Sequence, residues 1–182
     1  MATIEARHDH GTNPHTPVAQ DAGPARYVWA AARITIGFVF LWAFLDKTFG
    51  WGFATPAKKA WLEGGSPTTG FLKGTGENAL GGFFGGLAGQ PWVDWLFMLG
   101  LLGIGAALIA GAGMRIAAIT GGLLLVLMWA AELPLANNPV IDEHIVYAIV
   151  LAGLALAGAG DTLGLGKWWG ATPIVRRYPI LK

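Results

Sequence analysis

The ionisable side chains of this chain gather at the ends of long apolar runs. The first run ends in LWAFL and is followed directly by Asp46 and Lys47. Glu132 follows the residues WAA of a later run, and His144 opens the next run. A charged group inside lipid is costly unless it is paired or reaches water, so each one marks a candidate site. We predict that Lys47, Glu132 and His144 carry the chemistry, Lys47 as a cation and the other two as proton carriers.

Several neighbouring polar residues have a purely structural explanation. Asp142 and Glu143 open an apolar run, where acids favour a helix N-terminus through the helix dipole. Arg33 lies a few residues inside the first apolar run, on the side opposite to Lys47. Its side chain either extends to the lipid headgroups or forms an ion pair with Asp161. The ion pair, which would have a structural role, is the favoured interpretation.

The composition indicates a membrane protein. The 182 residues are 54% hydrophobic and only 13% charged, whereas a soluble domain usually has about 25% charged residues. The net charge of +1 gives no concentrated basic face, which argues against nucleic-acid binding. The chain has no cysteine, which excludes disulfides and cysteine-ligated metal centres. No metal or flavin site is evident.

Four apolar runs are each close to the ~20 residues that a helix needs to cross ~30 Å of hydrocarbon. Since unpaired backbone groups cannot face lipid, we expect these runs to be helices. The sequence therefore predicts an all-α polytopic membrane protein, a four-helix transmembrane bundle. The spans cover about residues 27–49, 93–112, 114–133 and 141–160.

The rest of the chain divides into two tails and one long loop. Residues 1–25 are polar, include His8, His10 and His15, and predict a disordered tail before the membrane domain of residues 26–170. Residues 50–91 form a long, partly helical first loop that reads as an interfacial segment or, alternatively, as a lid over a site. Residues 171–182 form a C-terminal tail.

Threading the four spans brings the ionisable side chains to one membrane face. Glu132 lies about 25 Å beyond Arg115 at ~1.5 Å per residue, which places it near the same face as Lys47 and His144. The long loop lies on this face. Arginine and lysine near the span ends mark the cytoplasmic side of a membrane protein, and here they gather at the opposite face. The face with the long loop is therefore predicted to be extracytoplasmic. Both termini are then cytoplasmic. The basic residues on that side are Arg26, Arg115, Lys167, Arg176, Arg177 and Lys182.

Three motifs resemble the DoxX/DoxD family of bacterial four-helix membrane proteins. The first comprises Arg33, Gly37, Phe40, Lys47, Phe49 and Gly50. The second is GAGMRIAA at residues 111–118, and the third is GAGDTLGLGKWW at residues 158–169. The chain departs from the family pattern at Ala43-Phe44 and Met98-Leu99, where many relatives carry His-Gly and a glutamate.

The resemblance implies a thiosulfate:quinone oxidoreductase, or a subunit of one, in the bacterial inner membrane. On this reading Lys47 meets the anionic substrate, and a quinone or substrate pocket includes Trp42, Trp129 and Asp46. Quinone is then the electron acceptor, and other membrane redox subunits or further copies of the chain are partners. The alternative is an accessory subunit that holds a larger redox complex at the membrane without chemistry of its own.

Overall fold

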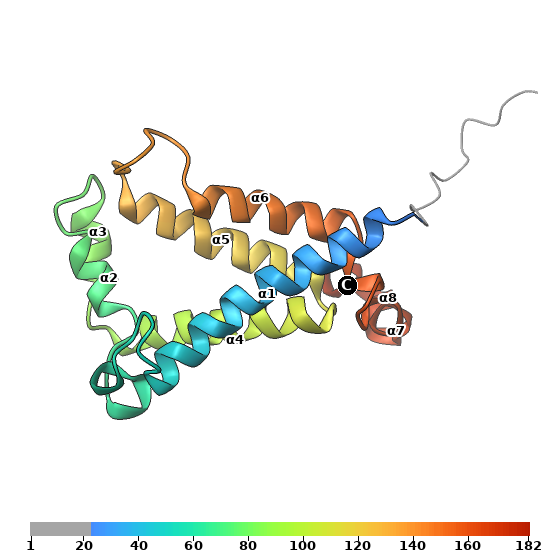
Figure 1. Cartoon of the computed structure of the whole chain (residues 1–182), viewed down its shortest axis with the longest axis horizontal. Helices are drawn as coiled ribbons and strands as arrows, with labels where there is room; N and C mark the ends of the chain where they lie inside the picture. The colour runs from blue at the N-terminus through green and yellow to red at the C-terminus, as the bar shows by residue number, and fades with distance from the viewer. Residues whose placement is uncertain (1–22) are drawn as a thin grey trace, which may run out of the picture.

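The computed structural model describes residues 23–182, and its regular structure in that range is entirely helical, with no strand. This confirms the all-α prediction for that part of the chain. The predicted tail histidines lie outside the described residues. Figure 1 shows the longer helices α1, α4, α5 and α6 running along the molecule, with short helices at both ends.

Three helices are long and apolar enough to cross a membrane. They are α1 (Ala25–Phe49), α4 (Pro91–Ala110) and α5 (Met114–Glu132). The fourth long helix, α6 (Glu143–Leu156), has 14 residues and is only about 21 Å long at ~1.5 Å per residue. The predicted fourth span over residues 141–160 therefore remains a prediction.

The helix ends follow the local sequence. Gly50, Gly111 and Gly113 adopt positive φ values of 67°, 71° and 70°, a conformation that costs other residues energy. Gly50 ends α1, and the Gly111–Gly113 turn reverses the chain between α4 and α5. Pro91 occupies the first turn of α4, where its missing N–H leaves no hydrogen bond unmade.

The long helices form two closely packed pairs, α1 with α4 and α5 with α6. Figure 1 shows the pairs meeting at one end and separating toward the other. We call the first the turn end, because it contains the Gly111–Gly113 turn. We call the second the loop end, because it contains Phe49, Pro91 and Glu132. The start of α1 and the C-terminus both lie at the turn end (Figure 1).

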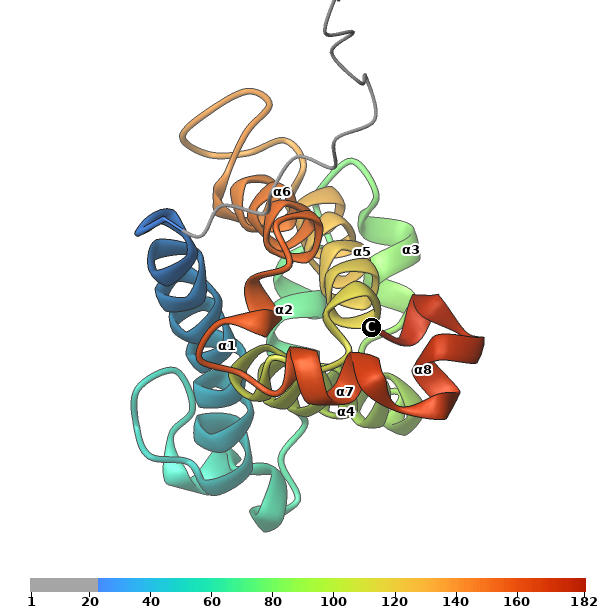
Figure 2. The same ribbon diagram turned by 90° about the vertical axis from the view of Figure 1, so that its right-hand side faces the viewer.

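Short helices close both ends of the bundle. The first loop contains the 3₁₀ helices η1 (Ala57–Lys59) and η2 (Trp61–Glu63), followed by α2 (Thr69–Gly74) and α3 (Gly81–Gly86). Beyond α6 come η3 (Ala159–Asp161), α7 (Gly166–Ala171), α8 (Pro173–Arg177) and η4 (Pro179–Leu181). Figure 2 shows α7 and α8 lying across the turn end.

The predicted C-terminal tail packs on the bundle. The amide of Arg115 donates to the carbonyl of Lys182 at 2.8 Å, and the Arg115 guanidinium donates to the Pro179 carbonyl at 3.0 Å. The Trp169 indole donates to the carbonyl of Leu181 at 2.6 Å. The two Arg115 bonds attach the end of the chain to the start of α5, and the Trp169 bond attaches it to α7.

The buried core joins all four long helices, and many large apolar side chains face outward instead. The core includes Phe40, Met98, Leu125 and Leu151. Outward-facing side chains occur on each helix, with exposed fractions above half for Phe38, Leu96, Leu99, Ile119, Leu123 and Ile149. Large exposed apolar faces are unfavourable in water and favourable in lipid. The three long apolar helices and these faces indicate a membrane protein.

Candidate functional site

A cavity of about 390 Å³ lies at the loop end, between α4 and α5. It falls within the ~300–1,000 Å³ range of sites that bind small molecules. α4, α5, α2 and α3 supply nearly all of its lining, and Lys47 of α1 is its one charged residue. The lining comprises Lys47, Pro67, Thr68, Phe71, Leu72, Phe83, Phe84, Leu87, Trp92, Val93, Leu96, Phe97, Leu124, Leu127, Met128 and Ala131.

Asp46 and Lys47, although adjacent, have separate roles. The buried Asp46 carboxylate accepts hydrogen bonds from the amides of Phe53 (3.3 Å) and Ala54 (3.0 Å), so it stabilises the turn that follows α1. Lys47 lines the cavity, and no ion pair joins it to an acid within residues 23–182. Asp46, which the sequence placed in the pocket, does not line it. Lys47 is left as a hydrogen-bond donor for a bound molecule.

The segment that covers the cavity is attached to α4 through Asp94. One carboxylate oxygen of Asp94 accepts from the Ser66 hydroxyl at 2.8 Å, the Thr68 hydroxyl at 2.6 Å and the Thr68 amide at 3.1 Å. The Asp94 residue is only 8% exposed, and bonds to a charged acceptor are stronger than neutral ones. Asp94 therefore positions the start of α2 over the cavity.

A second attachment joins the same segment to the end of α5. The Asn78 side-chain amide donates to the Ala131 carbonyl at 2.8 Å, and the Ala79 amide donates to the Leu133 carbonyl at 2.9 Å. These bonds satisfy carbonyls that the last turn of a helix leaves without partners. Helix α2 lies between Thr68 and Asn78 in the chain, so the two attachments hold it against the bundle.

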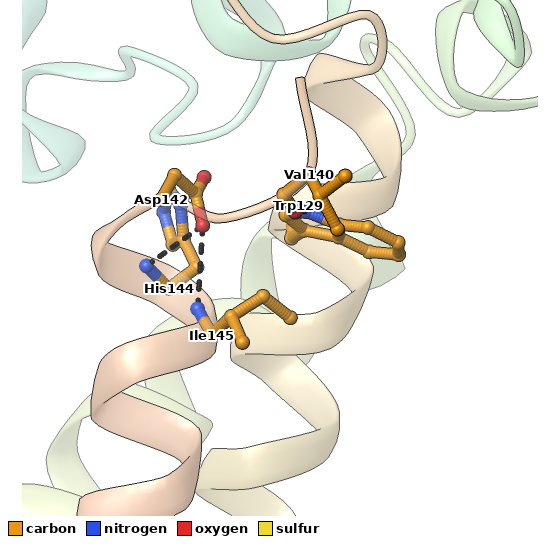
Figure 3. Close-up of polar contacts among 5 residues, drawn as sticks. All are labelled: Trp129, Val140, Asp142, His144 and Ile145. Carbon is orange, nitrogen blue, oxygen red and sulfur yellow. Dashed lines mark hydrogen bonds and ion pairs between the residues drawn. The ribbon is translucent and has the colours of Figure 1, made fainter. Parts of the chain in front are cut away.

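A polar cluster lies at the junction of α5 and α6, at the same end of α5 as the cavity. One ligand-type atom from each of Glu132, Asp142 and His144 lies within 4.8 Å of the other two. The Asp142 carboxylate lies 2.8 Å from Nδ1 of His144 and also accepts from the His144 and Ile145 amides at 3.1 and 3.3 Å. Figure 3 shows these bonds. Asp142 thus caps α6 and orients the imidazole.

Trp129 holds the connection between α5 and α6 near the cluster. Its indole N–H donates to the Val140 carbonyl at 2.9 Å (Figure 3). The Asn138 side chain accepts from the amides of Val140 and Ile141, each at 2.9 Å. The chain leaving α5 therefore returns beside Trp129, which places Asp142 close to Glu132. Trp129 positions backbone and is not among the residues that line the cavity.

Trp42 lies away from both the cavity lining and the cluster. Its ring contacts Phe38, Trp51 and Phe53, with centroid separations of 5.8, 5.3 and 5.1 Å. Aromatic groups of this kind are typical of the water–lipid interface of membrane proteins. Of the predicted site residues, the structure brings Glu132 and His144 together, puts Lys47 in the lining of the cavity and places Trp42 and Asp46 outside that lining. Their functional roles remain predictions.

Two parts of this region do not follow directly from the sequence. Asp142 is predicted as a helix-end acid, although the spacing of Asp142 and His144 at a helix start lets one carboxylate bind both the amides and the imidazole. The cavity is not predicted, because Phe71, Phe83 and Phe84 carry no chemical signal of their own. They line a cavity only after the loop folds over α4 and α5.

At the turn end, charged side chains bond to other groups of the chain. Arg33 is fully buried and donates through Nη1 to the carbonyls of Leu108 and Ile109, the latter at 2.9 Å. Nη2 donates to the carbonyls of Leu163 at 2.8 Å and Thr162 at 3.3 Å. The favoured Arg33–Asp161 ion pair does not form, because Asp161 pairs with Lys182 at 3.3 Å. Backbone carbonyls at the end of α4 attract the guanidinium instead.

Comparisons of the chain with protein-family models, with curated proteins and with solved structures find no match. The resemblance to the DoxX/DoxD family therefore remains an expectation that depends on the three sequence motifs.

Proposed function

We propose that this protein is a DoxX/DoxD-like integral membrane subunit of a redox system that binds a quinone in the loop-end cavity and passes electrons to it from thiosulfate or another sulfur compound. The cavity itself carries the proposal, because an apolar pocket with one cationic donor suits an apolar ring with polar carbonyl groups. The Lys47 ammonium would donate to a quinone carbonyl, and the aromatic lining would contact the ring.

The position of the cavity suits a ligand that arrives from the lipid. Three of its lining residues, Phe83, Trp92 and Leu96, are 65%, 57% and 66% exposed on the apolar surface of the molecule. A lipid-soluble molecule could therefore enter sideways between these side chains without crossing water. A water-soluble substrate would find almost no polar group in this lining other than Lys47.

Reduction of a quinone to a quinol takes up two electrons and two protons, so a quinone site also needs proton donors. Ala131 lines the cavity and the next residue, Glu132, belongs to the polar cluster. Glu132 follows Ala131 directly in the chain, so the cluster lies at the same end of α5 as the cavity. We propose that they carry protons between water and the bound quinone, while the sulfur compound supplies the electrons.

For the membrane arrangement we propose four spans, with residues 141–160 as the fourth. The start of α1 and the C-terminus lie at the same end of the molecule (Figure 1), as an even number of crossings requires. Arg26, Arg115 and Arg176 belong to that end, so the positive-inside rule favours cytoplasmic termini and a bacterial inner membrane. Redox subunits or further copies of the chain would be its partners there.

The test uses the full chain in detergent micelles, with decylubiquinone as the probe. Binding is followed by quenching of tryptophan fluorescence, and turnover by quinol formation after addition of thiosulfate. We expect Lys47→Met to weaken probe binding roughly tenfold, the equivalent of about 1.4 kcal/mol. The matched control is Lys73→Met, an exposed lysine on α2 that does not line the cavity. Equal binding by both variants would exclude Lys47 as the quinone ligand.

A second candidate function is the non-catalytic accessory subunit. One observation favours it. Hydrogen bonds within the chain engage three charged residues, Arg33 inside the bundle and Asp46 and Asp94 at the loop end. Absence of thiosulfate-dependent turnover, together with co-purification of a larger complex, would support this alternative. Probe binding without turnover would indicate a subunit that binds quinone for a separate catalytic chain.

A further inference from the structure

The cluster of Glu132, Asp142 and His144 has the donor set of a metal site. Each residue offers one ligand atom, and the three atoms lie within 4.8 Å of one another. Imidazole nitrogen and carboxylate oxygen bind Zn²⁺ at ~2.0–2.2 Å, which separates neighbouring ligand atoms by roughly 3–3.5 Å. Glu132 is the last residue of α5 and is partly exposed, and its carboxylate would have to move about 1–2 Å closer to the other donors to reach that separation.

Two of the three donors are held in place by the fold. Asp142 is fixed by the amides of α6, and it orients the His144 ring through Nδ1. For all three residues to bind one ion, the metal must take the place of the proton between Asp142 Oδ2 and His144 Nδ1, and the 2.8 Å between these two atoms is already close to the separation of neighbouring ligands on one ion. The connection that carries them is fixed by Trp129 and Asn138. Such preorganisation is what separates a binding site from acids that are close by chance.

The cluster also carries charge that the chain does not balance. Within residues 23–182 the Glu132 carboxylate has no hydrogen-bond partner, and no lysine or arginine pairs with Glu132 or Asp142. Two carboxylates therefore lie close to one imidazole that is 8% exposed. A divalent cation bound by Glu132, Asp142 and Nδ1 of His144 would offset the repulsion between the carboxylates.

We propose that Glu132, Asp142 and His144 bind a divalent first-row transition metal ion of the zinc class. The mixture of imidazole and carboxylate donors favours such an ion over Mg²⁺ or Ca²⁺, which prefer oxygen ligands alone. Three protein ligands leave a coordination position open, as in catalytic zinc sites. The inference does not rest on quinone binding, because Lys47 and the cavity take no part in metal binding. It competes with the proposed proton transfer, because an ion bound to Glu132 and His144 occupies the atoms that would carry the protons.

The test measures metal binding by the purified full chain in detergent after treatment with a chelator. CoCl₂ is titrated while the visible absorption bands of bound Co²⁺ are recorded, and ZnCl₂ is then used to displace it. The background protein carries alanine at His8, His10 and His15, because tail histidines could bind these ions independently. We expect about one Co²⁺ per chain, with bands of a low-coordinate nitrogen- and oxygen-ligated site.

Glu132→Gln should weaken Co²⁺ binding by more than tenfold, because it removes one ligand. Glu143→Gln is the matched control, since Glu143 is an exposed neighbouring acid outside the cluster, and it should bind as tightly as the background protein. His144→Ala should also lose binding; if it does not fold, Glu132→Gln decides alone.

No saturable binding, or equal affinity in the Glu132→Gln and Glu143→Gln variants, would overturn the proposal. Quinone binding is measured separately with decylubiquinone, so failure of one proposal is distinguishable from failure of the other.

Discussion

Arg33 and Lys47 are both cations of α1, yet the turn end and the loop end use them in opposite ways. The Arg33 guanidinium is fully buried among four backbone carbonyls, in a region where Gly111 and Gly164 leave room for it. Lys47 lines a cavity and has no ion-pair partner within residues 23–182. One apolar helix therefore carries both a cation whose donors are used within the chain and a cation whose donors are left for other groups.

The largest expected effect comes from removing the turn-end cation. Arg33→Met leaves buried carbonyls of α4 and of the Thr162–Leu163 segment without donors. We expect the free energy of unfolding in detergent to fall by about 3–5 kcal/mol, as for other broken buried charge networks. Denaturant titration followed by circular dichroism measures the loss. A loss below about 1 kcal/mol would break the comparison, because Arg33 would then not hold the turn end together.

The next effect concerns the close contact of α1 and α4 toward the turn end. A Cβ at Gly105 would lie 2.8 Å from the Leu41 nitrogen and 3.1 Å from the Gly37 carbonyl oxygen, both backbone atoms of α1. Gly105→Ala should therefore cost about 1–3 kcal/mol of stability through overpacking. Gly103→Ala on the same helix meets nothing within 4 Å and should be neutral or slightly stabilising. Similar midpoints for the two variants would show that the helices can separate freely.

A smaller and local effect is expected at the loop end. Asp94→Asn weakens the bonds to Ser66 and Thr68, so the segment over the cavity should open more often. We expect a cost of about 1 kcal/mol, confined to that segment. Limited proteolysis should cut the α2–α3 segment faster while the long helices remain protected. Glu77→Gln, an exposed acid of the same segment, is the control and should leave the cleavage rate unchanged.

The smallest stability effect is predicted for Lys47→Met, which sharpens the comparison with Arg33. Because Lys47 forms no ion pair within residues 23–182, the free energy of unfolding should change by no more than about 0.5 kcal/mol. The same denaturant titration measures it beside Arg33→Met. A loss comparable to that of Arg33→Met would mean that Lys47 is also a structural residue and that the cavity has no free cation.

The sequence by itself determined the helical class and the positions of most helix ends. Three of the predicted spans correspond to α1, α4 and α5, because a run of ~20 apolar residues has few stable alternatives to a helix in lipid. Glycines with positive φ and Pro91 set the ends, since both act through the local backbone. The sequence also indicated that Glu132 and His144 lie at the same end of the bundle, from helix rise and span order alone.

Only the tertiary structure decided which charged residues are paired and where the cavity lies. Hydrogen bonds join Asp46, Asp94 and Arg33 to groups that lie 7 or more residues away in the chain. No local sequence pattern predicts such partners. The contact of Glu132 with Asp142 and His144 likewise depends on the return of residues 133–141 beside Trp129. Packing between distant segments sets these distances, whereas helix formation depends on neighbours within about four residues.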